Sequence, residues 1–405
     1  MVRFIATIFL CISGIISFAQ TIESKKLTSA ADYFFAGEEA HEKGNAQEAI
    51  RYYNECLRLK ASYKDAYRSR AIVEEELENL EAALRDYTLY LELELDDPSE
   101  ALFSRAVLHF RLAHYELAKE DFIKLLDFPS KSTNTIFFRQ DVFAEGVDKM
   151  FTTQGSYQSI LYDYLGQIET KLKDYPAAIA YFDKAIKQNS QDTNLWLHRG
   201  LAKEKAGDIE GAMLDYQTAL HLDPQLSLAQ YNLAQLKGKK GENDQAKEFI
   251  DKAIENNHAL PYPYAQRAQF KTNKGDYKGA LADYDTAIRA KPLEATYWLN
   301  RGLVKEKLKD LNGANADFTH AIELKEDFDK AWFARANLCV KLNKLSAAID
   351  DYTIAIYHNP SHGGAYYNRG LAYQRMNKLK EACEDFAKAE SLGMPVDPAL
   401  KANCK

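Results

Sequence analysis

The chain has 405 residues, of which 46% are hydrophobic and 27% are charged, so it contains enough apolar material to fold around a core. Its formal net charge is -7, and its lysines and arginines are scattered along the sequence without a basic run. Nucleic-acid binding needs a basic surface that neutralises phosphates, so the composition argues against that class of protein.

The first segment of the chain is typical of an export signal. Arg3 supplies a positive charge, residues 4–18 form an apolar stretch, and Ser17-Phe18-Ala19 offers a cleavage site for signal peptidase. The stretch is short for a permanent membrane helix, although an uncleaved anchor is the alternative. We expect a signal peptide over residues 1–19, a linker over 20–29, and an exported protein located in the periplasm or at the cell surface.

A period of 34 residues organises most of the remaining chain. A small residue recurs in step, an alanine follows it after 12 residues, and a large apolar residue follows after 16. The small residues are Gly200, Ala234, Ala268, Gly302, Ala336 and Gly370, and the alanines are Ala212, Ala246, Ala280, Ala314, Ala348 and Ala382. Earlier units repeat the pattern around Gly37, Ala71, Ala106 and Gly166. Apolar residues three and four apart predict two amphipathic helices in each unit.

This pattern resembles the tetratricopeptide repeat, and the whole design resembles secreted bacterial proteins built from such repeats. The resemblance implies an all-α fold, a right-handed α-solenoid of about ten helical hairpins. We expect three repeats over residues 30–132 and seven over residues 159–396. Within a hairpin, a residue such as Gly207, Gly241, Gly275 or Asn343 is expected to break the chain between the two helices. A globular helical bundle is the alternative, which the sustained phase disfavours.

Seven of the ten repeats depart from the family pattern in the same way. An arginine precedes the small residue, an aspartate precedes the large apolar residue of the second helix, and the other three repeats have neither. The pairs are Arg70 with Asp86, Arg105 with Asp121, Arg199 with Asp215, Arg267 with Asp283, Arg301 with Asp317, Arg335 with Asp351, and Arg369 with Asp385. Their joint occurrence predicts a charge-assisted hydrogen bond within each hairpin. An anion-binding ladder of arginines is the alternative, disfavoured because every arginine has a carboxylate partner.

An insertion over residues 133–158 interrupts the period between the third and fourth repeats. Residues 133–138 and 150–153 are rich in β-branched and aromatic side chains, which predicts two short strands around a helical turn near residues 141–145. The insertion is either a tolerated loop or a specific contact site.

By resemblance to the family, the first helix of each hairpin lines a groove that holds a partner segment. The residues expected there follow the small residue by one or precede it by three: Leu197, Leu201, Tyr231, Gln235, Ala265, Gln269, Leu299, Leu303, Phe333, Asn337, Tyr367 and Leu371. The part between Leu299 and Leu371 is apolar for a surface, which favours a hydrophobic partner segment. The alternative is that these side chains pack between neighbouring first helices.

The C-terminal residues 397–405 are expected to fold back as a capping tail. Such a tail brings Cys404 to Cys383, and an oxidising compartment favours a disulfide between them, with two free thiols as the alternative. Cys56 and Cys339 occupy packing positions and are expected to be buried.

The sequence contains no phosphate-binding loop, nucleophile elbow or paired-cysteine zinc pattern, so we expect no catalytic residue, cofactor or metal site. The favoured function is a non-catalytic scaffold of the cell envelope that binds a protein or peptide partner. One alternative is a carbohydrate- or nutrient-binding component with Tyr231, Phe333 and Tyr367 as stacking platforms. Another is an accessory subunit of an envelope complex.

Overall fold

A computed structural model of the protein describes residues 27–93, 95, 97–128, 136–140, 147–152, 157–401 and 404. The chain divides into two units, residues 1–189 and residues 190–405. The expected signal peptide and the expected helical turn near residues 141–145 lie outside the described residues.

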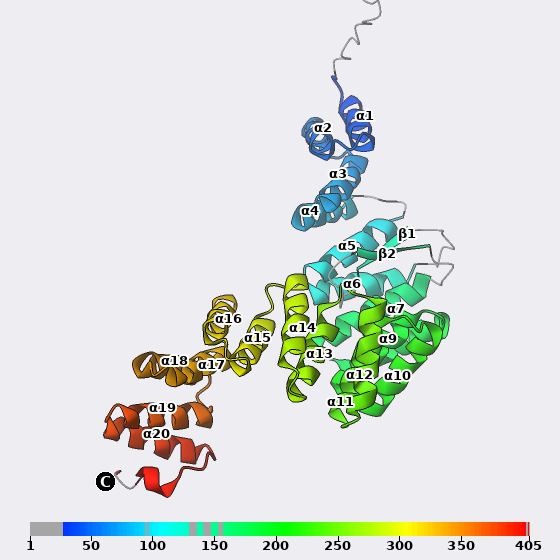
Figure 1. Ribbon diagram of the computed structural model, residues 1–405. Helices are drawn as coiled ribbons and strands as arrows, with labels where there is room; N and C mark the ends of the chain where they lie inside the picture. The colour runs from blue at the N-terminus through cyan, green and yellow to red at the C-terminus, as the bar shows by residue number, and fades with distance from the viewer. Residues whose placement is uncertain are drawn as a thin grey trace, which may run out of the picture. The chain divides into compact units, whose positions relative to one another are not determined.

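Within the described residues, twenty α-helices form ten hairpins, each made of two consecutive helices that pack against each other (Figure 1). The first unit contains α1 (Ala30–Glu42), α2 (Ala46–Leu59), α3 (Lys64–Glu76), α4 (Leu80–Leu91), α5 (Ser99–Arg111), α6 (Tyr115–Leu126), α7 (Tyr157–Leu172) and α8 (Tyr175–Gln188). The second unit contains α9 (Thr193–Ala206), α10 (Ile209–Leu222), α11 (Ser227–Lys239), α12 (Asn243–Asn256), α13 (Pro261–Asn273), α14 (Tyr277–Ala290), α15 (Ala295–Lys307), α16 (Leu311–Leu324), α17 (Asp329–Lys341), α18 (Leu345–His358), α19 (Gly363–Arg375) and α20 (Leu379–Ser391). The predicted fold class is therefore confirmed.

Each hairpin turns at one residue with a left-handed backbone conformation. Glycine occupies this position in four hairpins, for example Gly207 with a φ of 90°. The other six hairpins place a residue with a side chain there: Glu78, Ala113, Lys173, Lys309, Asn343 and Asn377. The ten positions recur with the repeat, and they include the four chain breaks expected from the sequence. Several second helices then begin at an aspartate that caps them, such as Asp310, which accepts a hydrogen bond from the Gly313 amide at 2.9 Å.

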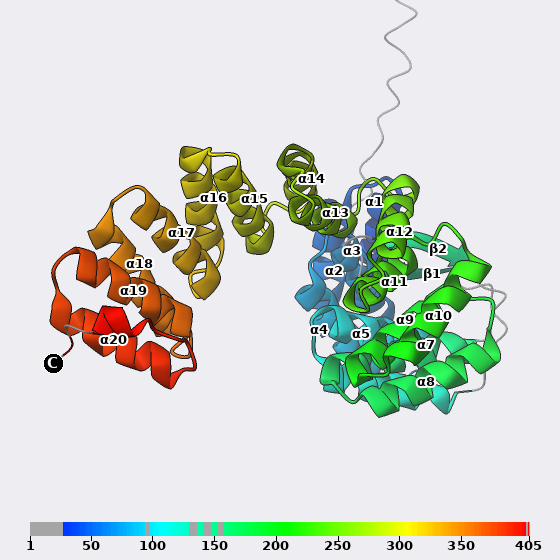
Figure 2. The ribbon, with the colours of Figure 1, turned by 60° about the horizontal axis from the view of Figure 1, so that its bottom comes forward.

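The small residue of the repeat allows the two helices of a hairpin to pack closely. A Cβ atom added at Gly302 would lie 2.6 Å from the ring of Phe318 on the second helix. Phe318 is fully buried, and its cluster extends into the next hairpin through Ala331 and Leu338 of α17. One hairpin therefore leaves an apolar face that only its neighbour covers, which explains why the hairpins stack (Figure 2).

The insertion between α6 and α7 contains the two predicted strands, β1 (Ile136–Gln140) and β2 (Val147–Thr152). They pair antiparallel, with Ile136 opposite Thr152. Each strand begins three residues away from its expected position.

The C-terminal tail folds back onto the last hairpin as expected, and it contains a 3₁₀ helix, Pro398–Lys401. Val396 is buried against Phe386 and Ala389 of α20. The predicted disulfide joins Cys383 to Cys404, while Cys56 and Cys339 are free and buried. Among the described helices, none combines the length and apolar character needed to cross a membrane.

Candidate binding groove

The structure brings the two members of all seven arginine–aspartate pairs together. In every pair the arginine donates from Nε and one terminal nitrogen to both carboxylate oxygens, over distances of 2.6–2.9 Å. The aspartates are at most 6% exposed. This bidentate geometry satisfies both partners within one hairpin.

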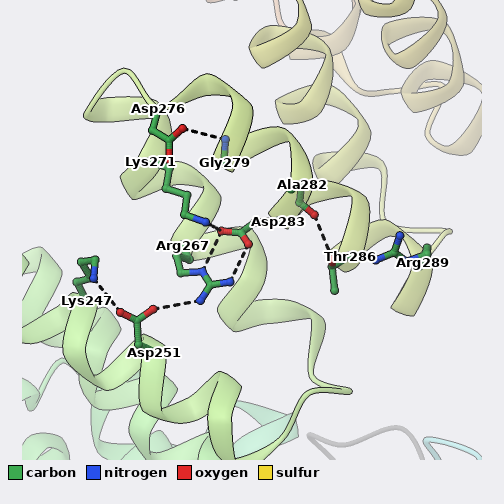
Figure 3. A network of polar contacts seen from close by, with 10 residues as sticks. All are labelled: Lys247, Asp251, Arg267, Lys271, Asp276, Gly279, Ala282, Asp283, Thr286 and Arg289. Carbon is green, nitrogen blue, oxygen red and sulfur yellow. Dashed lines mark hydrogen bonds and ion pairs between the residues drawn. The ribbon is translucent and has the colours of Figure 1, made fainter.

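The third guanidinium nitrogen makes a contact that the sequence reasoning missed. In Figure 3, Arg267 donates to Asp283 of its own hairpin and, over 3.2 Å, to Asp251 of the preceding one. Arg301, Arg335 and Arg369 bond in the same way to Asp285, Thr319 and Thr353. A polar residue 16 positions before the arginine was the signal for this link. Because these arginines join consecutive repeats, their role is structural and the anion-ladder alternative is disfavoured.

The predicted groove residues of the last three repeats converge on one cavity. The first helices α15, α17 and α19 contact each other in order along the second unit. They enclose a cavity of about 670 Å³ whose lining includes five of the expected residues: Leu299, Leu303, Phe333, Asn337 and Leu371. We call this cavity the C-terminal groove.

Exposure differs among the five residues. Leu303 is 41% exposed, and Phe333, Asn337 and Leu371 are partly exposed, so their side chains are accessible to a ligand. Leu299 is only 5% exposed because it packs on Ala314 and Phe318 of its own hairpin, and it forms part of the groove floor.

Leu299 and Leu197 are therefore both buried, and of the two only Leu299 lines the groove. Leu197 is 2% exposed and packs on Ala212 and Tyr216 of the second helix. At these two positions the leucine three residues before the small residue packs against the second helix of its own hairpin, whereas the alternative had placed it between neighbouring first helices.

The remaining expected residues lie outside the groove lining. Leu201, Tyr231, Gln235 and Ala265 are partly buried on α9, α11 and α13, and Gln269 is exposed on α13. The Gln235 amide donates to the Tyr231 hydroxyl, which occupies both side chains. Tyr367 lies on α19 but packs against Phe386, with ring centroids 6.1 Å apart.

A short polar network lies among the apolar walls of the groove. Asn337 Oδ1 accepts hydrogen bonds from the Tyr352 hydroxyl at 2.5 Å and from Asn368 Nδ2 at 2.9 Å. Burial raises the pKa of Tyr352 above its usual value, so its hydroxyl stays protonated and donates. The side-chain hydrogen bonds of Asn337 to described residues all involve Oδ1, so the N–H groups of its amide can donate to a ligand. The sequence reasoning missed Tyr352 and Asn368, because a single side chain at those repeat positions carries no signal of the network.

Comparison with known proteins gives consistent matches. Two family models, both described as tetratricopeptide repeat, match residues 165–227 and 273–327 and residues 33–63, 228–257 and 363–392. Tetratricopeptide repeat protein 16 of Homo sapiens is 27% identical over 162 residues, which cover 40% of this chain and 17% of that protein. A TPR repeat-containing protein of Methanocaldococcus jannaschii is 33% identical over 96 residues, which cover 24% of this chain and 17% of that protein. The chain thus spans less than a fifth of the length of each of these relatives.

Among solved structures, the APC/C hetero-tetramer Cut9-Hcn1 aligns with 14% identity and a TM-score of 0.47, covering 90% of this chain and 87% of that chain. A tetratricopeptide repeat protein from Parabacteroides merdae aligns with 18% identity and a TM-score of 0.46, and the alignment covers 60% of this chain and 96% of that chain.

Proposed function

Because the chain belongs to the tetratricopeptide-repeat family, whose repeats generally mediate protein–protein interactions, we propose that it is a non-catalytic scaffold that binds a segment of a partner protein in the C-terminal groove. The observation that carries the proposal is the convergence of five expected groove positions on one cavity across α15, α17 and α19.

The chemistry of the groove suits a polypeptide with an apolar anchor. Leu303, Phe333 and Leu371 offer apolar contact, and burying one leucine or phenylalanine of a partner among them contributes about 2 kcal/mol. The amide donor of Asn337 matches a backbone carbonyl, which every segment of a protein carries.

The carbohydrate alternative is less well supported, because all three of its aromatic platforms contact another ring, Tyr231 that of Tyr262 with centroids 5.9 Å apart. The ring of Phe333 lies 4.5 Å from that of His362 and 5.8 Å from that of Tyr352, measured between centroids. Tyr367 packs on Phe386. Sugar stacking needs an open ring face, whereas an aliphatic side chain needs only part of the ring, and Phe333 is partly exposed.

We place the protein in the cell envelope, after export. Two features support this location: the signal-like sequence of residues 1–19, and the disulfide between Cys383 and Cys404, since such bonds persist in oxidising compartments. A scaffold of this kind is also suited to act as an accessory subunit of an envelope complex.

The test is a quantitative pull-down from an envelope fraction with three forms of the protein. Phe333→Glu puts a charge into the groove, and we expect at least a tenfold loss of the captured partner, which corresponds to about 1.4 kcal/mol. Tyr357→Glu is the matched control, because Tyr357 is 79% exposed on the second helix α18, outside the groove lining. Equal capture by both variants would refute the proposal.

A further inference from the structure

The turns between the two helices of successive hairpins form a continuous edge of the second unit. Lys239 reaches back to Glu204 of the preceding repeat at 3.1 Å, Lys341 reaches back to Glu306, and Arg375 donates to Asn343 at 2.8 Å. These contacts place the turn after α11 beside the turn after α9, and the turns after α15, α17 and α19 beside one another. Residues of these turns that are 34 apart in sequence therefore become neighbours. We call the part of this edge that follows α15, α17 and α19 the turn edge: residues 305–310, 341–345 and 375–381.

The turn edge is strongly basic. It contains eight lysines and arginines and three acidic residues, on a chain whose net charge is -7. Five of its lysines are exposed and form no ion pair with a described residue: Lys307, Lys309, Lys344, Lys378 and Lys380. Of the acidic residues, Glu306 is paired with Lys341, and Asp310 caps α16. These basic residues are scattered in the sequence because they lie in three separate turns. Stacking of the hairpins brings the three turns together.

The opposite ends of the same three helices have the reverse balance. The turns that precede α15, α17 and α19, residues 292–296, 325–330 and 359–364, contain four acidic residues and two lysines. A helix of 13 residues, such as α17, is about 20 Å long, so the C-terminal groove lies between a basic and a more acidic edge. Glu306 and Lys341 belong both to the groove lining and to the turn edge, which makes the two surfaces continuous.

We propose that the partner segment bound in the C-terminal groove carries acidic residues on the side that meets the turn edge. The inference rests on the proposed function and specifies its partner: an apolar anchor among Leu303, Phe333 and Leu371, flanked by aspartate or glutamate. Complementary charge of this kind sets the orientation of the segment and accelerates its association at low salt.

The experiment selects random twelve-residue peptides, displayed on phage, with the purified protein. Three variants then test the selected peptides. The first is Phe333→Glu, the second combines Lys309→Glu, Lys344→Glu and Lys378→Glu, and the control combines Lys187→Glu, Arg289→Glu and Lys388→Glu. The control makes the same charge change at three exposed sites outside the turn edge. Circular dichroism verifies that each variant is folded.

We expect peptides that depend on Phe333 to be enriched in aspartate and glutamate over the unselected library. Their affinity falls at least tenfold with the turn-edge reversal and less than threefold with the control, and it weakens as salt rises. Phe333-dependent peptides without acidic enrichment, bound equally by the turn-edge variant, overturn this inference and leave the groove function standing. Failure to select any Phe333-dependent peptide overturns both proposals.

Discussion

Arg335 contacts three side chains through its guanidinium. Its Nε and one terminal nitrogen bond to Asp351 at 2.9 and 2.8 Å, its other terminal nitrogen reaches Thr319 at 3.2 Å, and its guanidinium lies over the ring of Trp332 at 4.8 Å. The hydrogen bonds that Arg335 donates to Asp351 are the largest influence that raises the pKa of Arg335. An arginine with this many partners has a structural role. Its net contribution to the free energy of unfolding is revealed only when one partner is removed.

We predict that Asp351→Ala destabilises the protein by about 3 kcal/mol, because it leaves a mostly buried guanidinium without its carboxylate. The double variant Arg335→Leu/Asp351→Ala should recover more than half of that loss, as measured by urea unfolding. This pair is a cleaner choice than Arg301 with Asp317, since Lys305 also binds Asp317 at 2.9 Å and would be stranded in either variant. Additive losses in the cycle would contradict the coupling.

At the scale of the element, the turn residue decides how a hairpin closes. Lys309 adopts a φ of 67°, a conformation that costs a residue with a side chain about 1 kcal/mol and costs glycine little. Other hairpins place glycine at the same position, for example Gly275 with a φ of 81°.

We predict that Lys309→Gly raises the free energy of unfolding by about 1 kcal/mol, because glycine removes the left-handed strain. Lys307→Gly is the control two residues earlier, at the end of α15, where glycine loses helix propensity and stability should fall. Thermal unfolding of both variants checks the prediction. A stabilised Lys307→Gly or a destabilised Lys309→Gly would show that the turn is not under this constraint.

The tail is the second element whose contribution can be measured. The disulfide closes a loop with a sequence separation of 21 residues, for which loop entropy gives about 3 kcal/mol. Cys404→Ser should therefore lower the stability of the last hairpin, and dithiothreitol should destabilise the wild type but not the variant. Hydrogen exchange in α19 and α20 measures the effect, and unchanged protection in the reduced protein would refute it.

At the scale of the whole chain, the sequence was sufficient for the features that many repeats share. The ten hairpins and the pairing of Arg335 with Asp351 follow from positions that recur in phase, so many copies support each inference. Features of a single copy were harder to predict. The burial of Leu299 depends on how closely its side chain fits against Ala314 and Phe318. The basic turn edge exists only once stacking brings the turn after α15 beside the turn after α17.

The claim on which the account depends is that the C-terminal groove binds the partner. The most direct measurement is site-specific photo-crosslinking in the producing cell, with a benzophenone amino acid at Leu303, which is 41% exposed in the groove lining, or at Leu214, which is 62% exposed on the second helix α10. We expect a discrete adduct with one protein at position 303, lost when Phe333→Glu is added, and none at position 214. An adduct at position 214 with none at position 303 would contradict it.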